Sequence, residues 1–165
     1  YINSAWFGFA SRIQSIRQAV VLLGQREIRR WVSLMTMRDL SQDKPAELLT
    51  TAVVRGRLCE QIARLAGHPQ EAASAFVVGM FSLLDALLDR QMEDIIPELS
   101  LAPEVATALQ GETTFLGKVL GLSRAYEQAE WEIVAAWCEK LAVDEAKIPG
   151  LYQEAVRWAD FANEA

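Results

Sequence analysis

Histidine is almost absent from this sequence of 165 residues, which contains only His68. Metal-dependent hydrolysis needs several imidazole and carboxylate groups that converge on one ion. A single histidine in a Gly-His-Pro turn cannot build such a site, so the sequence argues against a hydrolase of that kind. We expect His68 to be an exposed or capping residue of its turn.

Cysteine is also scarce, and long apolar runs are missing. Cys59 and Cys138 lie far apart and form no metal-binding spacing, which favours reduced thiols in a cytoplasmic protein, with a disulfide as the alternative. No apolar run reaches the roughly 18 residues of a membrane span, and no signal peptide is visible. The sequence thus predicts a cytoplasmic chain without membrane insertion.

Cofactor-binding motifs are missing as well. The sequence has no GxGxxG or P-loop pattern, and no Glu-x-x-His pair of the kind that holds a diiron centre. Neither cysteine has a histidine nearby in sequence to act as its base. We therefore expect no cofactor and no catalytic residue in this chain.

Basic residues are fewer than acidic ones, and the net charge is −6. Residues 1–82 contain 10 Lys and Arg against 6 Asp and Glu, a balance of +4, whereas residues 83–165 contain 6 against 16, a balance of −10. A nucleic-acid-binding protein needs a basic face, so the acidic total argues against that class. Two interpretations of the asymmetry stay open: the halves attract each other within the fold, or they present two faces to different partners.

Apolar residues are abundant, at 52% of the sequence, and they recur at helical spacing. Helices are predicted from Ser11 or Ser15 to Gly24, and over about 25–38, 46–66, 71–88, 91–99, 103–111, 114–128, 130–141 and 144–164. The helix over 71–88 is apolar almost all round, which is typical of a helix at the centre of a bundle. Pro149 and Gly150 are expected to delay or kink the last helix. With no alternating strand pattern, the predicted class is all-α.

Several short stretches, taken in order, resemble one family. They are NSAWFG at 3–8, IQSIRQA at 13–19, RRWVSL at 29–34, TAVVRGRLCE at 51–60, FSLLDALL at 81–88 and RWAD at 157–160. Together they resemble HDOD domains, the HD-related output domains of bacterial signalling proteins. They are most similar to the branch that is fused behind an EAL domain, the cyclic-di-GMP phosphodiesterase module.

The resemblance implies a fold and a domain organisation. The fold would be an all-α, HD-domain-like multi-helix bundle. Residues 1–165 would be an HDOD domain that lacks its N-terminal helices, as a fragment of a longer EAL–HDOD protein.

The resemblance also locates the positions where HD phosphohydrolases hold metals. The first family histidine falls near Thr51, and the His-Asp pair falls on Ser82 and Leu83. Neither site would bind a divalent metal well, so we call these three residues the vestigial HD positions. The Ser82 hydroxyl is expected to bond a backbone carbonyl instead.

Arg55, Arg57 and Asp85 are expected near the vestigial HD positions. In one interpretation an arginine pairs with Asp85 as a partly buried ion pair, because a lone charge there would be costly. In the other, the cleft still binds an anion or nucleotide through Arg55 or Arg57.

Two further features are candidates for contacts with other proteins. Arg26, Arg29 and Arg30 form a basic patch on one predicted helix, which is either a solvated face or a docking surface for the acidic C-terminal half or a partner domain. Trp131 and Trp137 lie six residues apart and so face different directions, which would leave one of them exposed to a partner.

The function predicted from these observations is that of a non-catalytic signalling or output domain in cyclic-di-GMP signal transduction. It would contact its own EAL domain, another signalling protein or a second copy in a homodimer. The alternative is a nucleotide or small-anion sensor that uses the vestigial HD cleft without hydrolysis.

Overall fold

A computed structural model describes residues 45–99 and 101–164 of the protein. These residues form eight α-helices and two short 3-10 helices, with no strand among them. The helices are α2 Ala46–Leu65, α3 Ala72–Phe81, α4 Leu84–Leu88, α5 Met92–Ile95, η2 Ile96–Glu98, α6 Pro103–Leu109, α7 Phe115–Glu127, α8 Trp131–Leu141, η3 Glu145–Lys147 and α9 Ile148–Glu164. The all-α prediction is confirmed for this part of the chain, while the helices expected over 11–24 and 25–38 lie outside the described residues.

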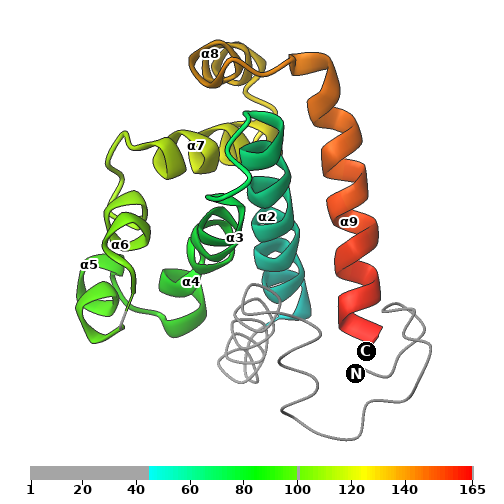
Figure 1. Cartoon of the computed structure of the whole chain (residues 1–165). Coiled ribbons are helices and arrows are strands. Elements are labelled where there is room, and N and C mark those ends of the chain that lie inside the picture. The colour runs from blue at the N-terminus through cyan, green and yellow to red at the C-terminus, as the bar shows by residue number, and fades with distance from the viewer. Residues whose placement is uncertain (1–44, 100, 165) are drawn as a thin grey trace, which may run out of the picture.

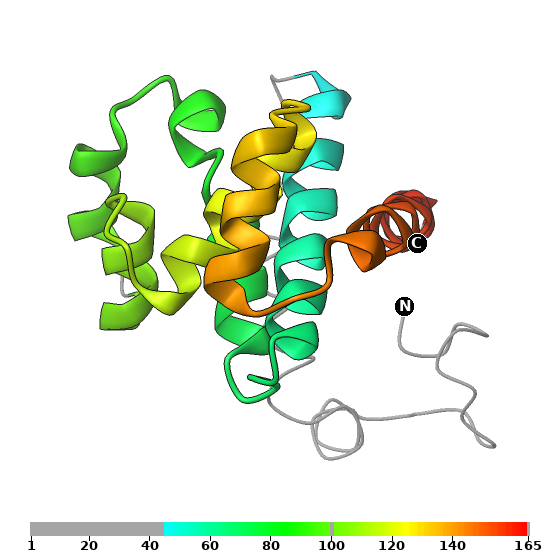
Figure 2. The ribbon, with the colours of Figure 1, turned by 90° about the horizontal axis from the view of Figure 1, so that it is seen from above.

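Helix α2 is the centre of the bundle (Figure 1). It packs against α3, α7 and α9. Because its apolar residues lie on several sides, it must be covered on several sides to remove them from water. Figure 2, seen from above, shows α9 on one side of α2 and α8 lying across the end of the bundle.

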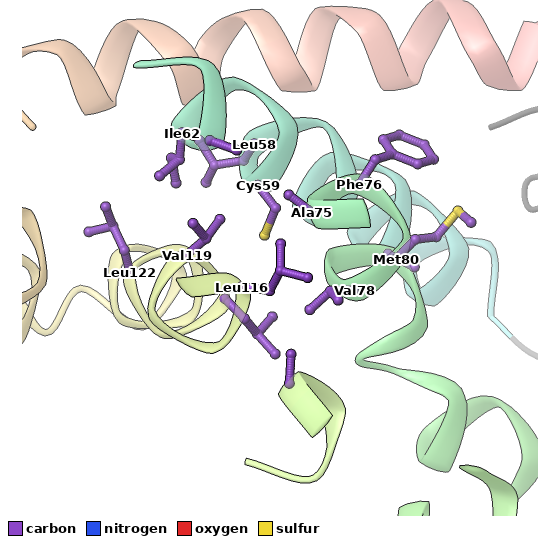
Figure 3. Close-up of a cluster of buried hydrophobic side chains, with 14 of the residues drawn as sticks. Leu58, Cys59, Ile62, Ala75, Phe76, Val78, Met80, Leu116, Val119 and Leu122 are labelled. Atoms are coloured by element: carbon purple, nitrogen blue, oxygen red, sulfur yellow. The ribbon is translucent and has the colours of Figure 1, made fainter. Parts of the chain in front are cut away.

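The core forms where α2, α3 and α7 meet (Figure 3). Leu58, Cys59 and Ile62 of α2 are fully buried there, and so are Val119 and Leu122 of α7. Burying each large aliphatic side chain contributes about 1.5–3 kcal/mol to folding. The predicted buried position of the segment that follows Glu71 is confirmed, because α3 supplies several of the side chains in this core.

Two glycines set the distance between α2 and α3. A Cβ atom on Gly79 would lie 2.6 Å from the carbonyl oxygen of Arg55 and 2.8 Å from the Cα atom of Gly56. A Cβ atom on Gly56 would lie 2.9 Å from the carbonyl oxygen of Phe76. These separations are too short for any side chain, so glycine is required at both positions for the backbones to approach so closely.

The single helix expected over 71–88 is wrong, because the chain breaks into α3 and α4 at Ser82 and Leu83. The Ser82 hydroxyl donates to the carbonyl of Gly79 at 2.7 Å, which confirms the hydrogen bond predicted for it. Leu83 then leaves the helical conformation, with φ −116° and ψ 12°. Leu84 and Leu87 are each 2% exposed, so the new direction of α4 still delivers its leucines to the core.

Glycine, threonine and proline mark several of the other helix ends. Gly67 and Gly111 adopt φ values of +81° and +88° just after α2 and α6. The side chain of Thr114 caps α7 by accepting from the backbone N–H of Gly117 at 3.1 Å. The predicted delay of the last helix is confirmed, because η3 precedes α9 and Pro149 falls in the first turn of α9.

The two cysteines and the single histidine all lie in the described part of the chain. Cys59 and Cys138 are both buried and are not joined by a disulfide in the structure. His68 is exposed in the turn after α2, as expected, and its ring centroid lies 4.2 Å from that of Phe115.

Among the described helices, none combines the length and the apolar character needed to cross a membrane.

We expect Gly79→Ala to lower the free energy of unfolding by about 1–3 kcal/mol, because its methyl group would force α2 and α3 apart. Urea denaturation would measure the change. The matched control is Gly150→Ala in α9, where a Cβ atom meets nothing within 4 Å. The control should be neutral or stabilising, and equal stability of the two variants would contradict the close-approach argument.

Candidate functional site

Polar side chains meet inside the bundle where α2, α3 and α7 come together. Arg55 comes from α2, Ser82 follows the last residue of α3, and Arg124 and Glu127 come from α7. We call these four residues the Ser82 cluster. Ser82 is 2% exposed and Arg55 is 8% exposed, so these two polar groups are enclosed in a largely apolar core, whereas the side of the cluster at Arg124 is exposed to solvent.

Arg55 is the hub of the Ser82 cluster. Its Nε donates to the two carboxylate oxygens of Glu127 at 3.1 and 3.0 Å, and its Nη2 lies 2.5 Å from Oε2. Its Nη1 donates to the Ser82 hydroxyl at 2.8 Å. Bidentate pairs of arginine with carboxylate are among the strongest hydrogen bonds in proteins, and removing one partner leaves a charge in a poorly solvated place. The pair therefore neutralises a charge that the core could not otherwise accommodate.

Arg124 reaches the same point from α7. Its Nη2 donates to the backbone carbonyl of Ser82 at 3.2 Å, which satisfies an acceptor at the C-terminal end of α3. Partial burial lowers the pKa of Arg124, and the positive charge of Arg55 lowers it further. Two guanidinium groups thus share Ser82, while Glu127 neutralises Arg55.

Cys59 lies beside the Ser82 cluster and is not a nucleophile in this setting. Burial raises the pKa of the Cys59 thiol from 9.0 to about 12, and a hydrogen bond with Ser123 offsets this only in part. The reactive form of cysteine is the thiolate, which is disfavoured at such a site. Its role is to fill the core between α2 and α7 (Figure 3).

A second group of ion pairs joins α2 to α9. Glu60 is fully buried and accepts from Arg57 at 2.7 Å and from Arg64 at 2.9 Å. Arg57 also lies 3.4 Å from the carboxylate of Glu154 and over the ring of Trp158, 5.6 Å from its centroid. The Nη1 and Nη2 atoms of Arg57 thus bind within the protein, while its buried Nε has no hydrogen-bond partner in the described part.

The vestigial HD positions do not come together as a cleft. Thr51 is exposed on α2, and its hydroxyl donates to the backbone carbonyl of Glu47 at 2.8 Å. Ser82 is bound to Arg55, and Leu83 packs against the core as a partly buried residue. Of these three positions, Ser82 alone joins the polar cluster.

Neither Arg55 nor Arg57 pairs with Asp85, so that expectation is wrong. Asp85 is exposed, and its carboxylate accepts from the backbone N–H of Ala86 at 2.8 Å. The helix break turns α4 away, so Asp85 lines an open, acidic hollow together with Asp89 and Asp94. Within the described residues, no group of three His, Cys, Asp or Glu side chains could hold a metal ion.

Two other predictions concern surfaces. Arg26, Arg29 and Arg30 lie outside the described residues. Trp131 is 57% exposed at the start of α8, whereas Trp137 is partly buried against the core, so the expectation that one of the two is exposed is confirmed.

Sequence reasoning missed Arg124 and Glu127. A usable signal was present, because Ser123, Arg124 and Glu127 place polar groups within about one turn of the mostly apolar α7. Arg55 on a buried helix needed a carboxylate, and the end of α7 offered one.

We expect Glu127→Leu to lower the free energy of unfolding by about 3 kcal/mol or more, because it leaves the charge of Arg55 largely buried and unpaired. The double variant Arg55→Met with Glu127→Leu should recover much of that loss. Urea denaturation of the two single variants and the double variant would give the coupling energy.

Arg90→Met is the matched control for this cycle. Arg90 lies 2.6 Å from Glu98, but the two side chains are 42% and 61% exposed, so losing this pair should change stability little. A Glu127→Leu effect no larger than that of the control would show that the Ser82 cluster is not a stabilising element.

The chain is similar to one protein family and to two curated proteins. The HDOD domain family matches residues 1–102, which is more than half of the sequence and includes α2 to η2. The uncharacterized protein YuxH of Bacillus subtilis is 36% identical over 161 residues, which cover 96% of this chain and 39% of that protein. The cyclic di-GMP phosphodiesterase CdgJ of Vibrio cholerae is 35% identical over 163 residues, which cover 99% of this chain and 38% of that protein.

The chain thus spans about two-fifths of the length of these relatives. No solved structure matches it significantly. Both the family match and the relatives agree with the order of short motifs in the sequence, and the chain belongs to the HDOD domain family.

Proposed function

We propose that this domain is a non-catalytic output domain in cyclic-di-GMP signalling. The observation that carries the proposal is the Ser82 cluster. Where a hydrolytic HD domain needs metal ligands, this chain has Ser82, and the charged group beside it is an arginine that Glu127 neutralises. A guanidinium group donates hydrogen bonds and cannot bind a metal ion.

The name of CdgJ supports the signalling context. That protein is named as a cyclic di-GMP phosphodiesterase, but this chain matches 38% of it. We propose that phosphodiesterase activity in such proteins belongs to an EAL domain outside the matched part. The domain described here would then act in the cytoplasm by contact rather than by chemistry.

The proposed partner is the EAL domain of the same longer protein. Trp131 and Ile133 are 57% and 45% exposed on α8, and exposed tryptophan is typical of protein interfaces. Tyr126 contacts Trp131 edge to face, with 5.7 Å between ring centroids, so the exposed indole is held in place. Another signalling protein and a second copy of the chain are the other candidates for this surface.

The alternative function, a nucleotide or anion sensor, has less support, because Arg55 and Arg57 were expected to bind its ligand and both already bind carboxylates. Arg55 binds Glu127, and Arg57 binds Glu60 and Glu154. An anion at either arginine would have to displace a carboxylate that is already part of the fold.

The purified chain, supplied with Mn²⁺ or Mg²⁺, should hydrolyse cyclic-di-GMP no faster than a protein-free blank, because the described part offers no metal-binding group. Chromatography of the products would measure this. Elemental analysis of the same preparation should find no stoichiometric metal. Metal-dependent hydrolysis that increases with protein concentration would refute the proposal.

Trp131→Ser should weaken binding to a separately purified EAL domain by about 30-fold, since tryptophan anchors at interfaces contribute roughly 2 kcal/mol or more. Isothermal titration calorimetry would compare it with Glu104→Gln, an exposed change on α6 that should leave affinity unchanged. Equal affinities of the two variants would place the docking surface elsewhere. Sedimentation of each variant alone would reveal self-association through the same surface.

A further inference from the structure

A cavity of about 200 Å³ lies beside α7, outside the set of vestigial HD positions. Gly117, Leu120, Gly121 and Arg124 line it from one face of α7, at helical spacing. Its other walls are the end of α6, the loop that contains Glu112 and Thr113, and Trp137 of α8.

Glycines on α7 let two walls of the cavity approach the helix closely. A Cβ atom on Gly121 would lie 2.8 Å from the indole ring of Trp137, and one on Gly117 would collide with the carbonyl oxygen of Glu112. The α8 indole and the α6–α7 loop therefore lie directly on the backbone of α7. Lys140 covers the ring of Trp137 at 4.4 Å from its centroid, which fixes the orientation of the indole.

Arg124 lines the cavity, and no carboxylate contacts its guanidinium group directly, although the negative charges of Asp85 and Glu127 attract it. Arg55, Arg57, Arg64 and Arg90 each form an ion pair, whereas no ion pair forms at Arg124 in the described part of the chain. Its hydrogen bond to the carbonyl of Ser82 uses one of the five N–H donors of a guanidinium group. Donors thus remain for a ligand.

We propose that this cavity binds a phosphate group, with Arg124 as its main contact. Arginine presents paired N–H donors that match the oxygens of phosphate, and the hydroxyl of Thr113 and the indole N–H of Trp137 are further donors among the lining residues. Pockets for whole drug-sized ligands measure about 300–1,000 Å³, so this smaller cavity suits a phosphate ion or the phosphate end of a larger molecule. The site does not depend on whether the domain also docks onto a partner.

Nuclear magnetic resonance of the full chain tests the site directly. The backbone amides of Gly117 and Gly121 and the indole N–H of Trp137 report on two walls of the cavity, α7 and α8. Sodium phosphate should shift these resonances in a saturable way, while sodium chloride at the same ionic strength should not. A parallel titration with GMP distinguishes the sources: tighter binding of GMP assigns the phosphate to a nucleotide, and equal or weaker binding assigns it to free phosphate.

Arg124→Gln should weaken phosphate binding about tenfold or more, because a charge-assisted hydrogen bond is lost. Lys118→Gln removes one positive charge from the same helix at a position outside the cavity lining and should have little effect. Glu112→Gln removes the exposed carboxylate that lines the cavity and should tighten binding by about two- to fivefold, without touching the core.

The proposal fails if phosphate and chloride give the same shifts. It also fails if Arg124→Gln and Lys118→Gln weaken binding equally, since that result would indicate a general charge effect. The exposed Glu112→Gln variant keeps the test decisive should Arg124→Gln lose stability: unchanged phosphate affinity in Glu112→Gln would overturn the site.

Discussion

The hydrogen-bonded ion pair between Arg55 and Glu127 is the interaction on which the described part of the fold depends. It links the central helix α2 to α7, and through the Ser82 hydroxyl it also fixes the end of α3. A buried charge without its partner is strongly destabilising, so the three helices must keep their relative positions for the core to remain closed. The polar cluster thereby specifies how the apolar surfaces around it pack.

That geometry requires the glycines at the crossing of α2 and α3. Since Gly56 and Gly79 let the two backbones touch, Arg55 can reach Ser82 at the end of α3. The break between α3 and α4 lies at the same crossing. There the Ser82 hydroxyl donates a hydrogen bond to the carbonyl of Gly79, and the Ser82 carbonyl accepts one from Arg124. The close approach of α2 and α3 and the hydrogen bonds of Ser82 therefore depend on each other.

Local signals in the sequence predict most of the helices in the described part. Apolar periodicity and capping residues are short-range features, and they locate α2, α7 and α8 to within about a residue at either end. The lone histidine likewise argues against a metal site on composition alone. The break at Ser82 and the partner of Arg55 could not be found in this way, because both depend on residues far along the chain. Asp85 was the wrong partner for the same reason: sequence proximity to Ser82 placed it near the cluster, and the turn of α4 moved it to the surface.

The position of Glu127 links two parts of the chain that lie on either side of the end of the family match. The family match stops at residue 102, yet the carboxylate that neutralises Arg55 lies 25 residues beyond it, on α7. The matched segment alone would expose the apolar side of α2 and leave a guanidinium group without its counter-charge. The ion pair therefore ties the segment that the family model matches to a helix outside that segment.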